Sequence, residues 1–184
     1  SGNKGVGQIN KRIILFLNVT LVMDPSHIQN VPVIVSILVI SSSRSKKEDT
    51  VGKKIKSLCE EADIPVHHVE IIPDDIQKIR DGLQRSLHIA SCVIITGGTG
   101  ITHDDCTIEA VEPLFQKRLD GFGELFRMKS FAEIGTRTVL SRTSAGIING
   151  KAVFCIPGSE NAADLATREI ILPEIHHILT HANK

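Results

Sequence analysis

Short runs of apolar, β-branched residues alternate along this chain with longer stretches in which apolar residues recur every three or four positions. Such runs occupy residues 31–41, 93–95 and 152–156, and residues 66–72 are a further predicted strand that contains His67 and His68. Continuous apolar runs are typical of buried parallel strands, and the longer spacing is typical of helices with one buried face. The alternation predicts the α/β class, a three-layer α/β/α fold with a mostly parallel central sheet.

Polar residues mark where the predicted helices begin. Thr50 precedes apolar residues spaced along one helical face, and we expect it to cap that helix. Asp74 has the residue type of an N-cap, and Gln77 follows three residues later, as in a capping box. A long closing helix is predicted over residues 161–182, with an interruption near Pro173.

The densest chemical signal lies at residues 96–105, directly after the predicted strand 93–95. Three of the four residues 97–100 are glycines, which accept positive φ and let a ligand approach the backbone. A Gly-rich turn between a strand and a helix start presents N–H groups to an anion, and Asp104 and Asp105 beside it can hold a divalent cation against phosphate groups. The alternative is an ordinary tight turn with solvated acidic side chains.

Four polar segments follow predicted strands: residues 41–44, Asp74, residues 96–105 and residues 157–159. Ligands of parallel α/β sheets bind outside the carboxyl ends of the strands. These segments are therefore expected to share one site.

Composition narrows the classes of partner. The 184 residues carry 21 basic and 21 acidic side chains, so no net charge attracts nucleic acid or an anionic membrane. Trp and Tyr are absent and only six Phe are present, which leaves little surface for stacking bases. We expect no nucleic acid and no membrane among the partners.

The four cysteines, Cys59, Cys92, Cys106 and Cys155, are widely spaced and form no C-x-x-C pair. This usage favours reduced thiols in a cytoplasmic protein over a disulfide or zinc framework. Residues 13–23 are apolar but too few for a membrane span, which needs about 20 residues. We therefore predict an N-terminal extension or oligomerisation arm over residues 1–30 and one domain over residues 31–184.

Five ordered motifs resemble the molybdopterin-binding family of molybdenum cofactor biosynthesis, the MoaB/MogA group related to the gephyrin G domain. They are Pro-Asp-Asp at 73–75, Thr-Gly-Gly-Thr-Gly at 96–100 followed by Asp-x-Thr-x-Glu-Ala at 105–110, Gly-Phe-Gly-Glu at 121–124, Leu-Ser-Arg at 140–142 with Ala-Gly at 145–146, and Pro-Gly-Ser at 157–159. The resemblance covers roughly residues 31–180.

This resemblance implies a molybdopterin adenylyltransferase, a nucleotidyltransferase that uses ATP and Mg²⁺ to make adenylyl-molybdopterin and release pyrophosphate. It also implies a homotrimer or hexamer. The alternatives are a non-catalytic molybdopterin-binding or carrier protein of the same fold, and a scaffold that acts through its oligomer.

The resemblance also implies the site residues. Asp74, Asp105 and Ser141 would be catalytic, and Asp74 and Asp105 would hold the metal. The backbone N–H groups of residues 97–100 would hold a phosphate. The residues expected to bind substrate or nucleotide are Thr96, Gly97, Gly98, Thr99, Gly100, Glu109, Arg142, Pro157, Gly158 and Ser159. One departure is Asp104, an acid at a position where the family usually has Arg.

Overall fold

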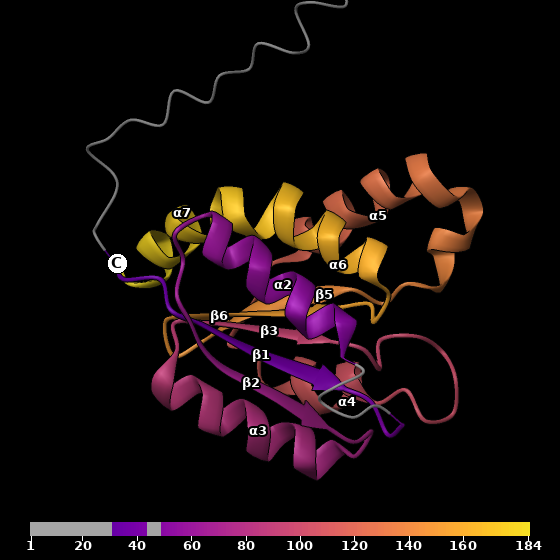
Figure 1. Ribbon diagram of the computed structural model, residues 1–184, viewed down its shortest axis with the longest axis horizontal. Coiled ribbons are helices and arrows are strands. Elements are labelled where there is room, and N and C mark those ends of the chain that lie inside the picture. The colour runs from indigo at the N-terminus through magenta and orange to yellow at the C-terminus, as the bar shows by residue number, and fades with distance from the viewer. Residues whose placement is uncertain (1–30, 44–48) are drawn as a thin grey trace, which may run out of the picture.

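The computed structural model describes residues 31–43 and 49–184. Within these residues a twisted six-stranded sheet is covered by helices on both faces (Figure 1). The predicted arm at residues 1–30 lies outside the described residues, so it stays a prediction. No helix in the described part is long and apolar enough to cross a membrane.

The sheet has the strand order β2-β1-β3-β6-β5-β4. Neighbouring strands run parallel from β2 to β6, and β5 is antiparallel to both β6 and β4. The strands are β1 (Val35–Ile40), β2 (Val66–Ile72), β3 (Cys92–Thr96), β4 (Lys117–Arg118), β5 (Ser144–Ile148) and β6 (Lys151–Ile156). This topology confirms the predicted α/β class with a mostly parallel sheet.

Two strand boundaries differ from the sequence-based expectation. The first strand begins at Val35 instead of residue 31, because Pro32 has no N–H and the N–H of Ile34 donates to the Ser91 hydroxyl at 2.9 Å. The β5–β6 hairpin was not predicted. Its turn is Asn149-Gly150 with φ of 49° and 73°, the pair of positive φ values that a two-residue hairpin turn requires.

The helices are α2 (Thr50–Glu61), α3 (Ile76–Ile89), α4 (Thr107–Val111), α5 (Asp120–Ile134), α6 (Glu160–Ala166) and α7 (Leu172–Ala182). Alternate residues of β1 separate two cores. Ile37 and Val39 pack beneath α2, α5, α6 and α7, and Leu38 and Ile40 pack against α3 and α4 (Figure 1). Short 3₁₀ segments follow two helices, η3 (Glu112–Leu114) and η4 (Gly135–Leu140).

Two helix caps lie one residue from their predicted positions. Asp49, not Thr50, caps α2 and accepts a hydrogen bond from the Gly52 N–H at 2.8 Å. Asp75, not Asp74, caps α3 and accepts from the Lys78 N–H at 2.8 Å. Asp74 is thereby released from the capping role.

The predicted interruption of the closing helix is a π-helical stretch, Thr167–Ile171, between α6 and α7. Pro173 follows it within the first turn of α7. Because proline has no N–H and its ring displaces the carbonyl four residues earlier, a wider turn at this point lets the helix continue without a break.

Candidate functional site

A cavity of about 770 Å³ opens at the carboxyl ends of β1, β3 and β6. All four polar segments that were predicted to share a site contribute to its wall, together with the end of α5 and η4. The predicted site residues that line it are Asp74, Gly97, Gly98, Thr99, Gly100, Asp105, Ser141, Pro157, Gly158 and Ser159. Chain segments far apart in sequence therefore meet at one place.

Contacts with α4 and β1 hold the Gly-rich loop after β3 in place. Gly97 and Gly98 have φ of 98° and 66°, in the region that only glycine adopts at low cost. The Thr107 hydroxyl donates to the Gly97 carbonyl at 2.7 Å, and the Thr107 N–H donates to the Gly98 carbonyl at 3.0 Å. A Cβ on Gly97 would lie 2.4 Å from the Ile40 carbonyl oxygen. Only glycine at position 97 therefore lets the loop fit between β1 and α4.

One of the four predicted anion donors is already used. The Gly97 N–H donates to the Ile156 carbonyl at 3.0 Å, extending the β3–β6 pairing, so it is not available to a phosphate. No hydrogen bond within residues 31–43 and 49–184 uses the N–H groups of Gly98, Thr99 and Gly100. The loop therefore offers three donors instead of four.

Asp74 joins the cavity through Ser42. One carboxylate oxygen, Oδ2, accepts from the Ser42 hydroxyl at 2.7 Å and from the Ser42 N–H at 3.1 Å. The Ser42 hydroxyl in turn accepts from the Asp74 N–H at 3.1 Å. The other oxygen, Oδ1, lies against Gly98, 3.3 Å from where a Cβ on that glycine would be. These contacts fix the carboxylate beside the Gly-rich loop.

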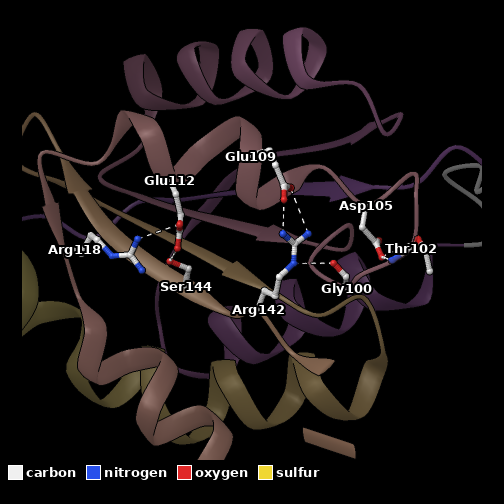
Figure 2. Close-up of polar contacts among 8 residues, drawn as sticks. All are labelled: Gly100, Thr102, Asp105, Glu109, Glu112, Arg118, Arg142 and Ser144. Carbon is white, nitrogen blue, oxygen red and sulfur yellow. Dashed lines mark hydrogen bonds and ion pairs between the residues drawn. The ribbon is translucent and has the colours of Figure 1, made fainter. Parts of the chain in front are cut away.

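Asp105 occupies the far side of the same loop. Its Oδ2 accepts from the N–H and the hydroxyl of Thr102, both at 2.8 Å (Figure 2). The same oxygen would lie 2.6 Å from a Cβ on Gly100. Both aspartates therefore flank the loop, each with one oxygen engaged by a neighbouring hydroxyl residue.

Cys106 follows Asp105 and is half-buried. Partial burial, and then the negative charge of Asp74, raise the pKa of its thiol. A raised pKa keeps the thiol protonated near neutral pH, which makes it a poor nucleophile. The structure gives Cys106 no activating partner within the described residues.

Arg142 and Glu109 pair with each other instead of lining the cavity. The Arg142 Nε donates to the Gly100 carbonyl at 2.8 Å, and its terminal nitrogens hold the Glu109 carboxylate (Figure 2). The hydrogen bond from Arg142 holds the pKa of Glu109 below its usual value. The Arg142 N–H also donates to the Thr99 carbonyl at 3.3 Å. This pair ties the segment carrying Ser141 to the Gly-rich loop.

Thr96 likewise supports the wall from behind. It is fully buried, and its hydroxyl donates to the Pro157 carbonyl at 2.9 Å. Gly158 then approaches Gly97 so closely that a Cβ on it would lie 3.1 Å from the Gly97 Cα. Ser159 caps α6 by accepting from the Ala162 N–H at 3.3 Å. The Pro-Gly-Ser turn is thus packed directly on the loop.

Residues 36–177 match the family described as "Probable molybdopterin binding domain". The chain belongs to this family. This match spans the sheet, both helical layers and every segment of the cavity wall.

Proteins of similar sequence carry names from molybdenum cofactor biosynthesis. The chain is 42% identical to Molybdenum cofactor biosynthesis protein B of Bacillus subtilis, over 86% of this chain and 96% of that protein. It is 41% identical to the protein of the same name from Staphylococcus epidermidis, over 84% of this chain and 92% of that protein.

Solved structures show the same fold. A crystal structure of Molybdenum cofactor biosynthesis protein B superposes with a TM-score of 0.80 at 40% identity, covering 84% of this chain and 98% of that one. The tungsten cofactor synthesizing protein MoaB from Pyrococcus furiosus gives a TM-score of 0.77 at 39% identity, covering 83% and 98%.

Sequence reasoning missed one wall of the cavity in this molybdopterin-binding domain. The end of α5 and η4 contribute Phe126, Ser130, Ile134, Arg137, Thr138 and Leu140. These residues do not follow the end of a strand. The expectation that ligands bind at the carboxyl ends of parallel strands therefore does not identify them. The Gly-Phe-Gly-Glu motif at 121–124 and the Leu-Ser-Arg motif at 140–142 bracket this region in sequence, but neither identifies the residues between them.

Proposed function

We propose that this chain acts in molybdenum cofactor biosynthesis by adenylylating molybdopterin, with ATP as co-substrate and pyrophosphate as by-product. One observation carries the proposal: Asp74, the Gly-rich loop with Asp105, Ser141 and the Pro-Gly-Ser turn come from four separate chain segments and line a single cavity. The names of the relatives, which are cofactor biosynthesis proteins, support the broader role.

The reaction joins two phosphate groups. An oxygen of the molybdopterin phosphate attacks the α-phosphorus of ATP, the bond from that phosphorus to the bridging β-oxygen breaks, and pyrophosphate leaves with the electron pair. Both reactants are anions, so the protein must supply positioning and positive potential. The N–H groups of Gly98, Thr99 and Gly100 are suited to hold one phosphate group.

Mg²⁺ fits this donor set. Asp74 and Asp105 flank the loop, and the carboxylate oxygen of each that neighbouring hydroxyl residues leave unused can coordinate a hard cation. Within the described residues no group of three or more His, Cys, Asp or Glu side chains is placed to hold a metal. Phosphate oxygens and water would therefore complete the coordination, and the bound ion would neutralise developing charge on the phosphates.

Ser141 would orient a phosphate by hydrogen bonding. Its hydroxyl is 2.7 Å from that of Thr143, so Ser141 can accept from Thr143 and donate its own proton into the cavity. Ile134, Leu140 and Ala162 also line the cavity and offer apolar side chains to a planar ring of the nucleotide or pterin. Pro157, Gly158 and Ser159 would border that ring.

A carrier that binds molybdopterin without adenylylating it is the second candidate. Asp104 favours it, because this acid lines the cavity at a position where the family usually has Arg. Two like charges 4 Å apart near a protein surface repel by about 4 kcal/mol. This repulsion would weaken ATP binding more than binding of a single phosphate.

A homotrimer or hexamer is also part of the proposal. Large apolar side chains are exposed along α5 and η4: Met128, Phe131, Ile134, Val139 and Leu140. Several large apolar side chains exposed on neighbouring elements are typical of a protein interface. Light scattering at micromolar concentration should give a multiple of the 20.1 kDa subunit mass, and a single-subunit mass would contradict an oligomer.

The decisive experiment measures pyrophosphate release from ATP in the presence of molybdopterin and Mg²⁺. Release that requires all three components supports the adenylyltransferase. Tight molybdopterin binding without ATP-dependent release would instead support the carrier.

A further inference from the structure

The charges on the cavity wall are unbalanced for phosphate substrates. Three carboxylates line it, those of Asp74, Asp104 and Asp105, and Arg137 is the only Lys or Arg among the described lining residues. The proposed substrates carry several negative charges between them. Positive charge must offset this excess of acid: Mg²⁺ held by Asp74 and Asp105 would supply part of it, and Arg137 is the cation that the described part of the wall itself offers.

Arg137 has no competing partner among the residues that the structure describes. Its side chain is exposed, and it forms no ion pair or hydrogen bond with any residue of the described part of the chain. Other arginines near the site are occupied. Arg142 holds Glu109, and Arg127 donates to the Thr143 carbonyl at 3.0 Å. The guanidinium of Arg137 thus retains all its donors for a ligand.

The backbone that carries Arg137 is fixed even though its side chain is exposed. The next residue, Thr138, is buried, and its hydroxyl donates to the Ser130 hydroxyl of α5 at 3.3 Å. The Thr138 carbonyl accepts from the Ser141 N–H at 3.0 Å. Arg142, beside Ser141, bonds the Gly-rich loop. Arg137 is therefore held in register with Ser141 and with that loop.

We propose that Arg137 is a substrate-binding residue that contacts a phosphate group of the nucleotide in this cavity. The inference rests on the proposed function and adds a residue that the five motifs do not include. A guanidinium presents paired N–H donors that match two oxygens of one phosphate, which a lysine ammonium cannot reproduce. In this role Arg137 supplies the positive charge that Asp104 and its neighbours lack.

Isothermal titration calorimetry with Mg·ATP, inorganic pyrophosphate and AMP tests the proposal. Arg137→Ala should weaken Mg·ATP binding by about ten- to a hundredfold, the loss expected when a charge-assisted hydrogen bond is removed. Arg137→Lys should retain part of the affinity. Asp104→Asn should change affinity in the opposite direction, because it removes a negative charge from the same wall.

The matched control is Arg168→Ala. Arg168 is also exposed, but it pairs with Asp164 and does not line the cavity, so its loss should leave ligand affinity unchanged. Equal melting temperatures for Arg137→Ala and the parent would show that the fold is intact. A loss for Mg·ATP and pyrophosphate but not for AMP would assign the contact to the β- and γ-phosphates. A loss for all three would show that Arg137 contacts a terminal phosphate group, whichever of the three molecules carries it.

Two results overturn the inference and differ in their meaning. If the parent binds Mg·ATP and Arg137→Ala binds it equally well, Arg137 has no binding role and the proposed function stands. If the parent binds neither Mg·ATP nor pyrophosphate, the proposed nucleotide chemistry fails together with the inference.

Discussion

The adjacent residues Asp74 and Asp75 allow a matched pair of substitutions that separates catalysis from helix capping. The two acids are adjacent, yet Asp75 caps α3 whereas the Asp74 carboxylate lies in the cavity beside Gly98. Asp74→Asn and Asp75→Asn remove the same charge one residue apart. Activity should respond only to the change at Asp74.

The expected stability changes follow from the contacts. Asn and Asp cap helices about equally well, so Asp75→Asn should be nearly neutral, whereas Asp75→Ala should cost about 1 kcal/mol. An Asn at position 74 retains a carbonyl oxygen that can accept from the Ser42 hydroxyl and N–H, so Asp74→Asn should also cost less than about 1 kcal/mol. In a chain of this size, 1 kcal/mol corresponds to a shift in melting temperature of about 2–4 °C.

The expected effect on catalysis is much larger. An amide neither carries the charge nor coordinates Mg²⁺ as a carboxylate does. Removing one preorganised electrostatic group from such a site lowers kcat by about 10²–10³, or roughly 3–4 kcal/mol of transition-state stabilisation. Asp74→Asn should therefore be folded and nearly inactive, and raised Mg²⁺ should not restore it.

The assay is pyrophosphate release from Mg·ATP and molybdopterin, with thermal unfolding measured on the same preparations. Asp75→Asn must turn over like the parent for the comparison to be valid. A catalytic role for Asp74 is refuted if Asp74→Asn keeps turnover within about threefold of the parent, or if the two Asn variants lose activity equally.

Three further predictions follow from neighbouring contacts. Asp105→Asn should lower turnover by about 10²–10³ with little change in melting temperature, and unchanged turnover in the same assay would remove it from the metal site. Gly98→Ala should lose both stability, by about 1–3 kcal/mol in urea unfolding, and Mg·ATP binding, because its Cβ would lie 2.4 Å from the Thr107 hydroxyl and its φ is positive. Glu109→Gln should cost at most about 1 kcal/mol, because the pair with Arg142 is largely exposed. Because Arg142 lowers the Glu109 pKa from 4.5, the parent's advantage over this variant should be complete above about pH 5 and decline as the pH falls below that value; an advantage that grows in acid would contradict the assignment.

Much of the architecture is determined by local sequence. The apolar runs at β1, β3 and β6 specify buried strands, because a chain with apolar residues on both faces must be covered on both sides. The edge strand β2, which carries His67, His68 and Glu70, is only partly buried. The glycines after β3 specify a turn that other residues cannot adopt. The Asn149-Gly150 pair likewise specifies the β5–β6 hairpin locally, because both residues adopt the positive φ that a two-residue turn requires.

Tertiary structure decided the rest, because the deciding contacts join residues distant in sequence. Whether Asp74 or Asp75 caps α3 depends on Ser42, 32 residues from Asp74, which engages the Asp74 carboxylate and holds it in the cavity. Arg137 belongs to the cavity wall only because η4 is tied to α5 and to the Gly-rich loop. Local sequence fixes which conformations each segment favours, but the partners of a charged side chain are set by which segments the folded sheet brings together.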